Sequence, residues 1–181
     1  WNTYNNSNDI SGGIGGGGHG SPVSGIVGAK GNNGNGVSGV NWDVKIMMVV
    51  GGGNEAEAIA AYSYPLIMRK LYEQTGGTKG AYVVSTNASW GVDYAQASSA
   101  PLWCAMYDSL GKYGILSAGA TANLNLNIDV NGDLPTSCPS DFLISVTNMN
   151  RSDVKVNSAG YGATTIDIGA FGEDAYTIEK G

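Results

Sequence analysis

The sequence is short of charged residues and of long apolar runs. Only 13% of its 181 residues are Asp, Glu, Lys or Arg, and the formal net charge is −6 at pH 7. Nothing basic is clustered, so we expect no nucleic-acid partner. No apolar run approaches the ~20 residues that a membrane-spanning helix needs. The 42% share of hydrophobic residues predicts a folded globular chain with no membrane span.

Histidine and cysteine are also scarce. The chain has one histidine, His19, and two cysteines, Cys104 and Cys138. The cysteines can form a disulfide or stay as buried thiols. A bridge would close a loop of about 35 residues and contribute roughly 4 kcal/mol on the chain-entropy model. Low charge together with much Gly, Asn, Ser and Thr suits a secreted, extracellular enzyme, in which the bridge is the expected state.

The order of apolar segments predicts the fold class. A first helix is expected to begin at His19-Gly20, with Ser21 as N-cap and Pro22 at the first helical position. Two further helices are expected over 55–71 and over 100–110. Buried strands are expected at 44–50, 81–85, 114–117, 142–146 and 164–168. This alternation indicates an α/β fold with three layers, in which a mostly parallel sheet has helices on both faces. The active site of such a sheet lies at the carboxyl ends of its strands.

The segment with most chemical content is His19-Gly20-Ser21-Pro22-Val23-Ser24-Gly25. It follows a glycine-rich loop, and the adjacent glycine allows a substrate to approach closely. A histidine at a helix N-terminus is kept neutral, because the helix dipole disfavours a positive charge there. The segment therefore predicts a histidine that can act as a general base.

This segment is similar to the H-G-T-x-V-A-G motif of the subtilisin-like serine proteases (subtilases). The resemblance continues in order through six further segments of the chain. These are Gly34–Val40, Asn87–Gly91, Ser117–Gly119, Pro135–Val146, Ser158–Gly162 and Asp167–Gly172. In this family a histidine takes the proton from a serine nucleophile while an aspartate orients the ring. The resemblance implies that the chain is an internal part, residues 1–181, of one subtilisin-like catalytic domain and that His19 is the general base.

The resemblance also implies a substrate cleft. Its residues are Ser89, Trp90, Gly91, Ser117 and Gly119. They would hold an extended peptide or protein substrate through backbone hydrogen bonds. No cofactor is expected for the chemistry.

Two parts of the family's catalytic machinery do not match a segment here. The G-T-S-x-A-x-P motif of the nucleophile does not occur, and Asp9 lies in a turn-like segment unsuited to the orienting aspartate. The remaining parts of the same protease are thus expected partners, and the 181 residues alone are expected to be inactive. Opening on Trp1 without an initiator Met or signal peptide, the chain is interpreted as processed, truncated or incomplete.

The position of the oxyanion-hole asparagine also departs from the family. Ala120 stands where the family has Asn after Ser117-Ala118-Gly119. Loss of one such donor costs ~10²–10³ in rate. Asn123 is either a displaced donor or one more polar loop residue.

A structural Ca²⁺ is a further expectation from the resemblance, because subtilases often bind the ion in the loop after the histidine helix. Its ligands would be the Asn33 side chain and the carbonyl groups of Gly31, Asn35 and Val37. An ordinary Asn-Gly turn explains the same residues equally well.

Three alternatives remain at this stage. A non-catalytic subtilase-like module could hold peptides in the same cleft. Residues 49–56 have the form of a dinucleotide-binding turn, with Glu73 as a remote candidate for the ribose ligand. The glycine runs at 15–18 and 51–53 could be placeholders rather than native sequence.

Overall fold

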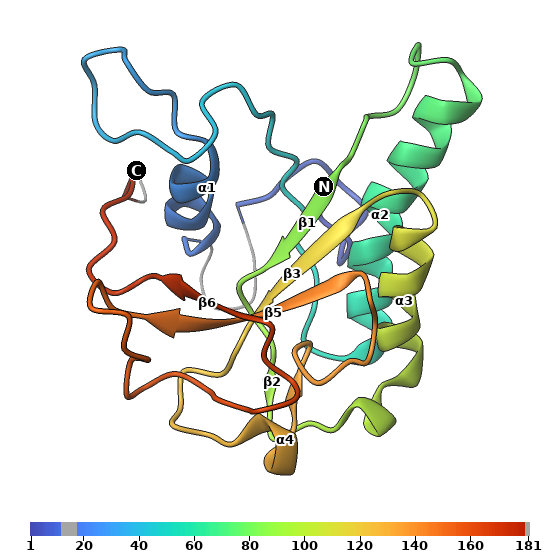
Figure 1. Ribbon diagram of the computed structural model, residues 1–181. Helices are drawn as coiled ribbons and strands as arrows, with labels where there is room; N and C mark the ends of the chain where they lie inside the picture. The colour runs from blue at the N-terminus through green and yellow to red at the C-terminus, as the bar shows by residue number, and fades with distance from the viewer. Residues whose placement is uncertain (12–17, 180–181) are drawn as a thin grey trace. The chain divides into compact units, whose positions relative to one another are not determined.

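The computed structural model describes residues 1–11 and 18–179 (Figure 1). It divides into two compact units, each described here by itself. One unit is Gly52–Glu173, and the other is Trp1–Gly51 with Asp174–Gly181. That residues 1–181 belong to one catalytic domain stays a prediction.

The unit Gly52–Glu173 contains a parallel sheet of four strands. In spatial order the strands are β1 (Ser85–Ala88), β3 (Leu116–Ala120), β5 (Leu143–Met149) and β6 (Ile168–Phe171). A short antiparallel ribbon joins β2 (Val92–Asp93) to β4 (Asp133–Leu134). The mostly parallel α/β class predicted from the sequence is confirmed.

The helices of this unit are α2 (Glu55–Gln74), α3 (Pro101–Gly111), the four-residue α4 (Ile128–Asn131) and the 3₁₀ turn η1 (Ala97–Ser99). The side chain of Asn54 caps α2 by accepting a hydrogen bond from the Glu57 amide at 3.0 Å. Pro101 occupies the first turn of α3, where its missing N–H costs nothing. Both predicted helices are confirmed, and α3 packs against α2 and β3 (Figure 1). Within residues 1–11 and 18–179, no helix has the length and apolarity to cross a bilayer.

The apolar core lies around α3. Trp103, Tyr107 and Leu110 are at most 1% exposed, and Ile115 before β3 is fully buried. Burial of each such side chain contributes about 1.5–3 kcal/mol. The Tyr107 hydroxyl accepts from Trp103 Nε1 at 3.0 Å and donates to the Tyr62 hydroxyl at 2.9 Å, so these polar atoms are paired inside the core.

A disulfide joins Cys104 of α3 to Cys138, which lies between β4 and β5. The expected bridge is therefore confirmed. It fixes the β4–β5 connection to the core helix.

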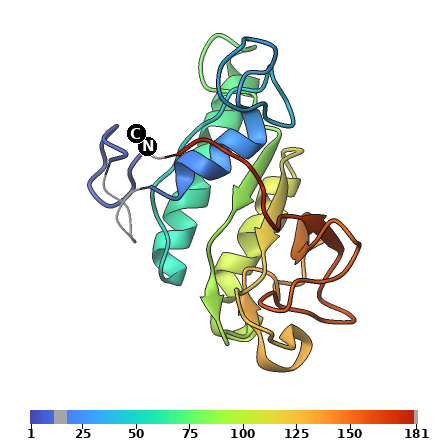
Figure 2. The ribbon, with the colours of Figure 1, turned by 90° about the vertical axis from the view of Figure 1, so that its left-hand side faces the viewer.

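The other unit contains one helix, α1 (Gly20–Gly28), within its described residues. Other segments approach α1 closely at its glycines. A Cβ at Gly25 would lie 2.5 Å from Thr177 Oγ1, and one at Gly28 would lie 2.5 Å from Val44. Figure 2 shows the C-terminal segment crossing α1, where the Thr177 hydroxyl donates to the Pro22 carbonyl.

The predicted start of α1 at His19-Gly20 is confirmed, but the predicted capping residue is wrong. The helix begins at Gly20 with His19 as its N-cap, so Ser21 and Pro22 lie inside its first turn. The hydroxyl of Ser24, one turn on, donates to the Gly20 carbonyl at 2.7 Å. Ser21 is thus not the capping residue that the Ser-Pro pair indicated.

One predicted strand is also wrong, and the strand predicted at 81–85 begins only at Ser85, as β1. Residues 44–49 form no strand, and Val50 makes only an isolated bridge to Asn2. Among the described residues of this unit, only the segment near Asn2 bonds to the backbone of this apolar run, which is too little for a ladder. Residues 81–84 precede β1, because Arg69 binds the Val83 carbonyl at 2.6 Å and the Ala81 amide bonds back to α2.

The remaining strand predictions are displaced toward the C-terminus. The observed β3 and β5 overlap the predicted ranges 114–117 and 142–146. The observed β6 shares only Ile168 with the predicted range 164–168. The three residues at 163–165 instead turn their amides toward Asp129 of α4.

Candidate active site

His19 lies at the N-terminal end of α1 with its side chain exposed. Its backbone is already helical, with φ −63° and ψ −34°, and its side chain makes no capping hydrogen bond. The ring nitrogens are therefore not used to hold the helix end. This placement fits a group that exchanges a proton with a bound partner.

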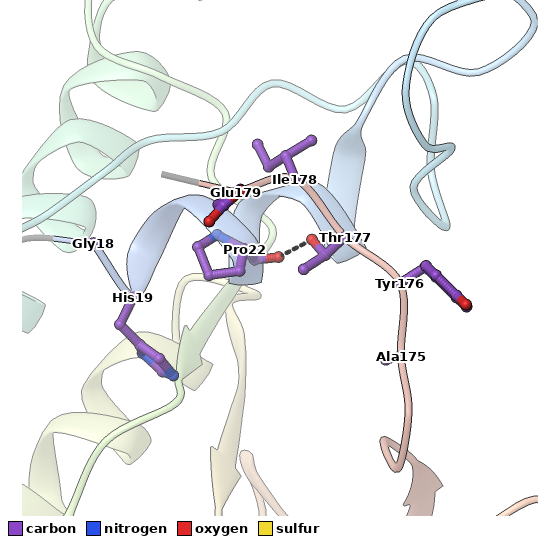
Figure 3. A pocket seen from close by; sticks show the side chains of 8 residues that line it. All are labelled: Gly18, His19, Pro22, Ala175, Tyr176, Thr177, Ile178 and Glu179. Carbon is purple, nitrogen blue, oxygen red and sulfur yellow. Dashed lines mark hydrogen bonds between the residues drawn. The ribbon is translucent and has the colours of Figure 1, made fainter. Parts of the chain in front are cut away.

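A pocket of about 440 Å³ opens beside His19 (Figure 3). Its lining comes from two segments of the same unit, namely 18–22 and 175–179. Figure 3 shows the imidazole of His19 pointing away from the Glu179 side chain. The histidine thus has open space next to it, and that carboxylate does not orient the ring.

The predicted cleft residues Ser89, Trp90 and Gly91 directly follow β1, as expected for a site at the carboxyl ends of parallel strands. The Trp90 indole stacks on Trp103, with 5.1 Å between ring centroids, so its side chain anchors the segment to the core. A Cβ at Gly91 would lie 2.0 Å from the Leu134 carbonyl oxygen. Gly91 is therefore needed for the close passage of β4.

The other two predicted cleft residues lie in β3. Ser117 is 1% exposed, and its hydroxyl accepts from Thr86 Oγ1 at 2.8 Å. A Cβ at Gly119 would lie 2.8 Å from Pro135 Cγ. Gly91 and Gly119 therefore lie against the same chain segment, Leu134–Pro135. The role of the predicted cleft residues in substrate binding stays a prediction.

Asn123 is exposed in the turn that follows β3. Ala122, the residue before it, donates its amide to Oδ2 of the buried Asp133 at 3.1 Å. The same oxygen accepts from the Thr136 hydroxyl at 2.6 Å. The pKa of Asp133 is raised to about 6, because burial and, to a smaller extent, the charge of Asp93 raise it more than the hydrogen bonds from Thr136 and Ala122 lower it.

Sequence reasoning missed Asp133. A signal was available, because Asp133 is an acid directly before the Leu134-Pro135 segment in a chain with few charges. Nothing in the sequence showed that this segment would pack beside the turn after β3.

The predicted calcium ligands lie in the loop after α1, where Asn33 and Asn35 are exposed and Gly31 is buried. The Asn33 side-chain oxygen accepts from the Asn35 amide at 3.0 Å, which is an Asx turn. Gly34 and Gly36 have φ of +72° and +59°. Carbonyl and amide oxygens are donors that Ca²⁺ accepts, so the donor type fits. Over the described residues, no group of three or more His, Cys, Asp or Glu side chains is placed to hold a metal ion.

The structure does not support the dinucleotide alternative. The turn at 51–53 does not follow a strand, because residues 44–49 are not one. Glu73 lies near the end of α2 and accepts from Arg69 Nε at 2.7 Å. The strand–turn–helix context of such a site is therefore missing. The glycines at 15–17 lie outside the described residues.

Comparison with known proteins gives the family. The model of the Subtilase family matches residues 1–179, so the chain belongs to this family. No curated protein matches it.

Solved structures with the same fold are proteases of this type. A psychrophilic protease called S41 matches with a TM-score of 0.65 and 18% identity, over 90% of this chain and 54% of its own. An epidermin leader peptide processing serine protease from Staphylococcus aureus matches with a TM-score of 0.62 and 17% identity, over 86% and 40%. The subtilisin-like protease Apa1 from Pseudoalteromonas sp. AS-11 matches with a TM-score of 0.58 and 22% identity, over 87% and 32%. The chain thus spans about half or less of the length of these proteins, and the likeness establishes a subtilisin-like fold.

Proposed function

We propose that the chain supplies the catalytic histidine and part of the substrate cleft of a serine endopeptidase. The observation that carries this proposal is the family match over residues 1–179 together with the exposed His19 at the start of α1. The segment Ser89–Gly91, which follows the carboxyl end of β1, supplies the edge along which an extended peptide would pair.

In this proposal His19 accepts the proton of a serine hydroxyl as that oxygen attacks the scissile carbonyl. The proton then passes from the imidazole to the leaving amine. Asn123 donates its side-chain amide to the oxygen on which negative charge develops. The serine and the acid that orients His19 come from the remaining parts of the protease, because the printed sequence holds no matching segment for either.

The test is hydrolysis of a denatured protein substrate by the longest product of the gene that encodes this chain. We expect His19→Ala to reduce kcat by about 10⁴–10⁶-fold, because the serine then has no base. Asn157→Ala, at an exposed position outside the site, is the matched control. Equal activity of the His19→Ala and control variants would overturn the proposal.

The 181 residues by themselves serve as a second control. Without a serine in the family's motif, they should release no peptide from the same substrate. Hydrolysis by the purified 181-residue chain that survives in its His19→Ala variant would contradict the assignment of the base.

We propose a structural Ca²⁺ in the loop after α1, held by the Asn33 side chain and the carbonyls of Gly31, Asn35 and Val37. All donors in this set are neutral oxygens, so binding should be weak. Millimolar CaCl₂ should raise Tm of the wild type, and Asn33→Ala should abolish that rise while Asn5→Ala keeps it. An unchanged Tm of the wild type with CaCl₂ would exclude the site.

We also propose that the protein acts outside the cytosol. The Cys104–Cys138 disulfide supports this location, because such bonds persist in oxidising compartments. Recovery of the protein from culture medium with the bond intact would agree, and recovery only from the cytosol with free thiols would not.

A further inference from the structure

Asp133 is a buried carboxyl group that the proposed triad does not use. The residue is 1% exposed and lies in β4. We propose that Asp133 is a positioning residue, whose carboxylate fixes, through the Ala122 amide, the turn that carries Asn123. This inference rests on the proposed function, in which Asn123 is the oxyanion donor.

The turn after β3 is held from two sides at Ala122. Its amide donates to Asp133 Oδ2 at 3.1 Å, and its carbonyl accepts from the Gly160 amide at 3.0 Å. The next residue is Asn123, which is exposed. A donor stabilises developing charge only when its backbone is already in place. Fixing Ala122 therefore sets where the Asn123 amide can point.

The carboxylate is itself tied to the framework of the unit. Thr136 donates its hydroxyl to Asp133 Oδ2 at 2.6 Å, and the Thr136 carbonyl accepts from Ser145 Oγ of β5 at 2.9 Å. Two residues further on, Cys138 is bonded to Cys104 of α3. Asp133 thus connects the turn to β5 and to the core helix.

The charge of Asp133 should change within the pH range in which many enzymes work. Burial, together with the charge of Asp93 directly opposite in the β2–β4 ribbon, raises its pKa to about 6. Ala122 and Thr136, which contact it from the turn and from the β4–β5 connection, are neutral. Above this pKa the carboxylate accepts both hydrogen bonds, and below it one oxygen carries a proton. The hold on the turn should therefore change near pH 6.

The first experiment follows the amide proton of Ala122 by NMR in the ¹⁵N-labelled 181-residue chain from pH 4 to 8. We expect its chemical shift to change with a midpoint near 6. Asp133→Asn, which keeps the shape and cannot ionise, should remove the change. Asp141→Asn, at an exposed acid in the β4–β5 connection, is the matched control and should keep it. An Ala122 titration that survives in Asp133→Asn would overturn the proposal.

The second experiment measures hydrogen exchange of the same amide. In Asp133→Ala the Ala122 amide should exchange at least about 10-fold faster than in Asp133→Asn, because asparagine still offers an acceptor oxygen to this amide and alanine offers none. The Tyr113 amide, which bonds to Leu110, reports any global loss of stability. The exchange rate of the Tyr113 amide is used to correct for any global loss of stability. Equal protection of the Ala122 amide in both variants after this correction would contradict the role of Asp133. If Asp133→Ala does not fold, the NMR titration in Asp133→Asn decides alone.

A third experiment separates this inference from the proposed function. In the active protease, Asp133→Ala should lower kcat by about 10-fold or more relative to Asp133→Asn, with little change in KM. It should cause no further loss in an Asn123→Ala background, because both changes act on one donor. Fully additive losses would overturn action through Asn123. A normal kcat of Asn123→Ala would instead overturn the oxyanion role in the proposed function, while the Ala122 titration still judges the positioning by Asp133.

Discussion

The two units of the chain differ in what their described residues bury. In the unit Gly52–Glu173 the buried side chains are largely apolar and centre on Trp103, Tyr107 and Leu110. In the other unit the buried residues are Asn2 and three glycines, while Val40 is 87% and Trp42 48% exposed. The first unit is stabilised by a core, and the second by backbone hydrogen bonds and close chain crossings at glycine.

The proposed catalytic histidine and the predicted cleft residues lie in different units. The predicted cleft residues follow strands that are anchored to the core, as the Trp90–Trp103 stack shows. His19 lies on a helix with three glycines in nine residues, which is a poor intrinsic helix former. We infer that the cleft segment is rigid in the 181-residue chain and that the histidine helix opens more readily.

The largest expected effect compares one tryptophan from each unit. Trp103→Ala should lower the free energy of unfolding by about 3–5 kcal/mol, because it leaves a cavity in the core. Trp42→Ala, at a half-exposed position, should cost no more than about 1 kcal/mol. Urea denaturation followed by circular dichroism measures both. Equal losses would remove the distinction between the units.

The disulfide gives the next effect. Replacing both Cys104 and Cys138 by Ala should lower the free energy of unfolding by about 2–4 kcal/mol, because the unfolded chain loses its closed loop. Reduction of the wild type by a thiol reagent serves as the control and should give a similar loss. A variant as stable as the oxidised wild type would show that the bridge adds nothing to this unit.

The pH dependence of stability isolates Asp133. Its pKa is about 6 in the folded chain and ordinarily 3.8, so its contribution is fully present below 3.8 and is lost as pH rises through 6. Asp133→Asn cannot ionise, so it should be less destabilising at pH 7.5 than at pH 4.5. We expect the difference to be roughly 1–2 kcal/mol after solvent screening. Urea denaturation at both pH values checks it, and a difference that Asp141→Asn reproduces would not come from Asp133.

The smallest effect concerns the contact between α2 and α3. Glu55 Oε1 accepts from the amides of Leu102 at 2.8 Å and Trp103 at 3.2 Å, at the N-terminus of α3. Glu55→Gln should cost about 0.5–1 kcal/mol, because a neutral oxygen binds these amides less strongly. Glu57→Gln is the matched control in the same turn of α2. An equal or larger loss in the control, by thermal unfolding, would assign the effect to α2 alone.

The sequence predicted the elements of the core-bearing unit better than those of the other unit. Residues 55–71 and 100–110 form helices because their apolar periodicity is satisfied by packing of α2 against α3. The run at 44–50 has the composition of a buried strand, but a strand also needs neighbours along its length. Composition reports the preference for burial, and it cannot report which backbone neighbours are present.

The candidate site shows the same limit. Local motif residues such as His19 and Gly91 were recognisable, since each sits where its motif places it, at a helix start and after a strand. Asp133 escaped notice because Ala122, eleven residues earlier, is brought to it by the fold and by no recognisable motif. Its other partner, Thr136, is three residues further along the chain and does not by itself indicate a role.

The central claim is that His19 activates a serine in the complete protease. It is tested most directly by labelling the longest gene product with a fluorophosphonate probe, which reacts with an activated serine. We expect rapid labelling of the wild type and its loss in His19→Ala. Failure of the wild type to label would favour a non-catalytic peptide-binding module, and equal labelling of His19→Ala would contradict the role of His19.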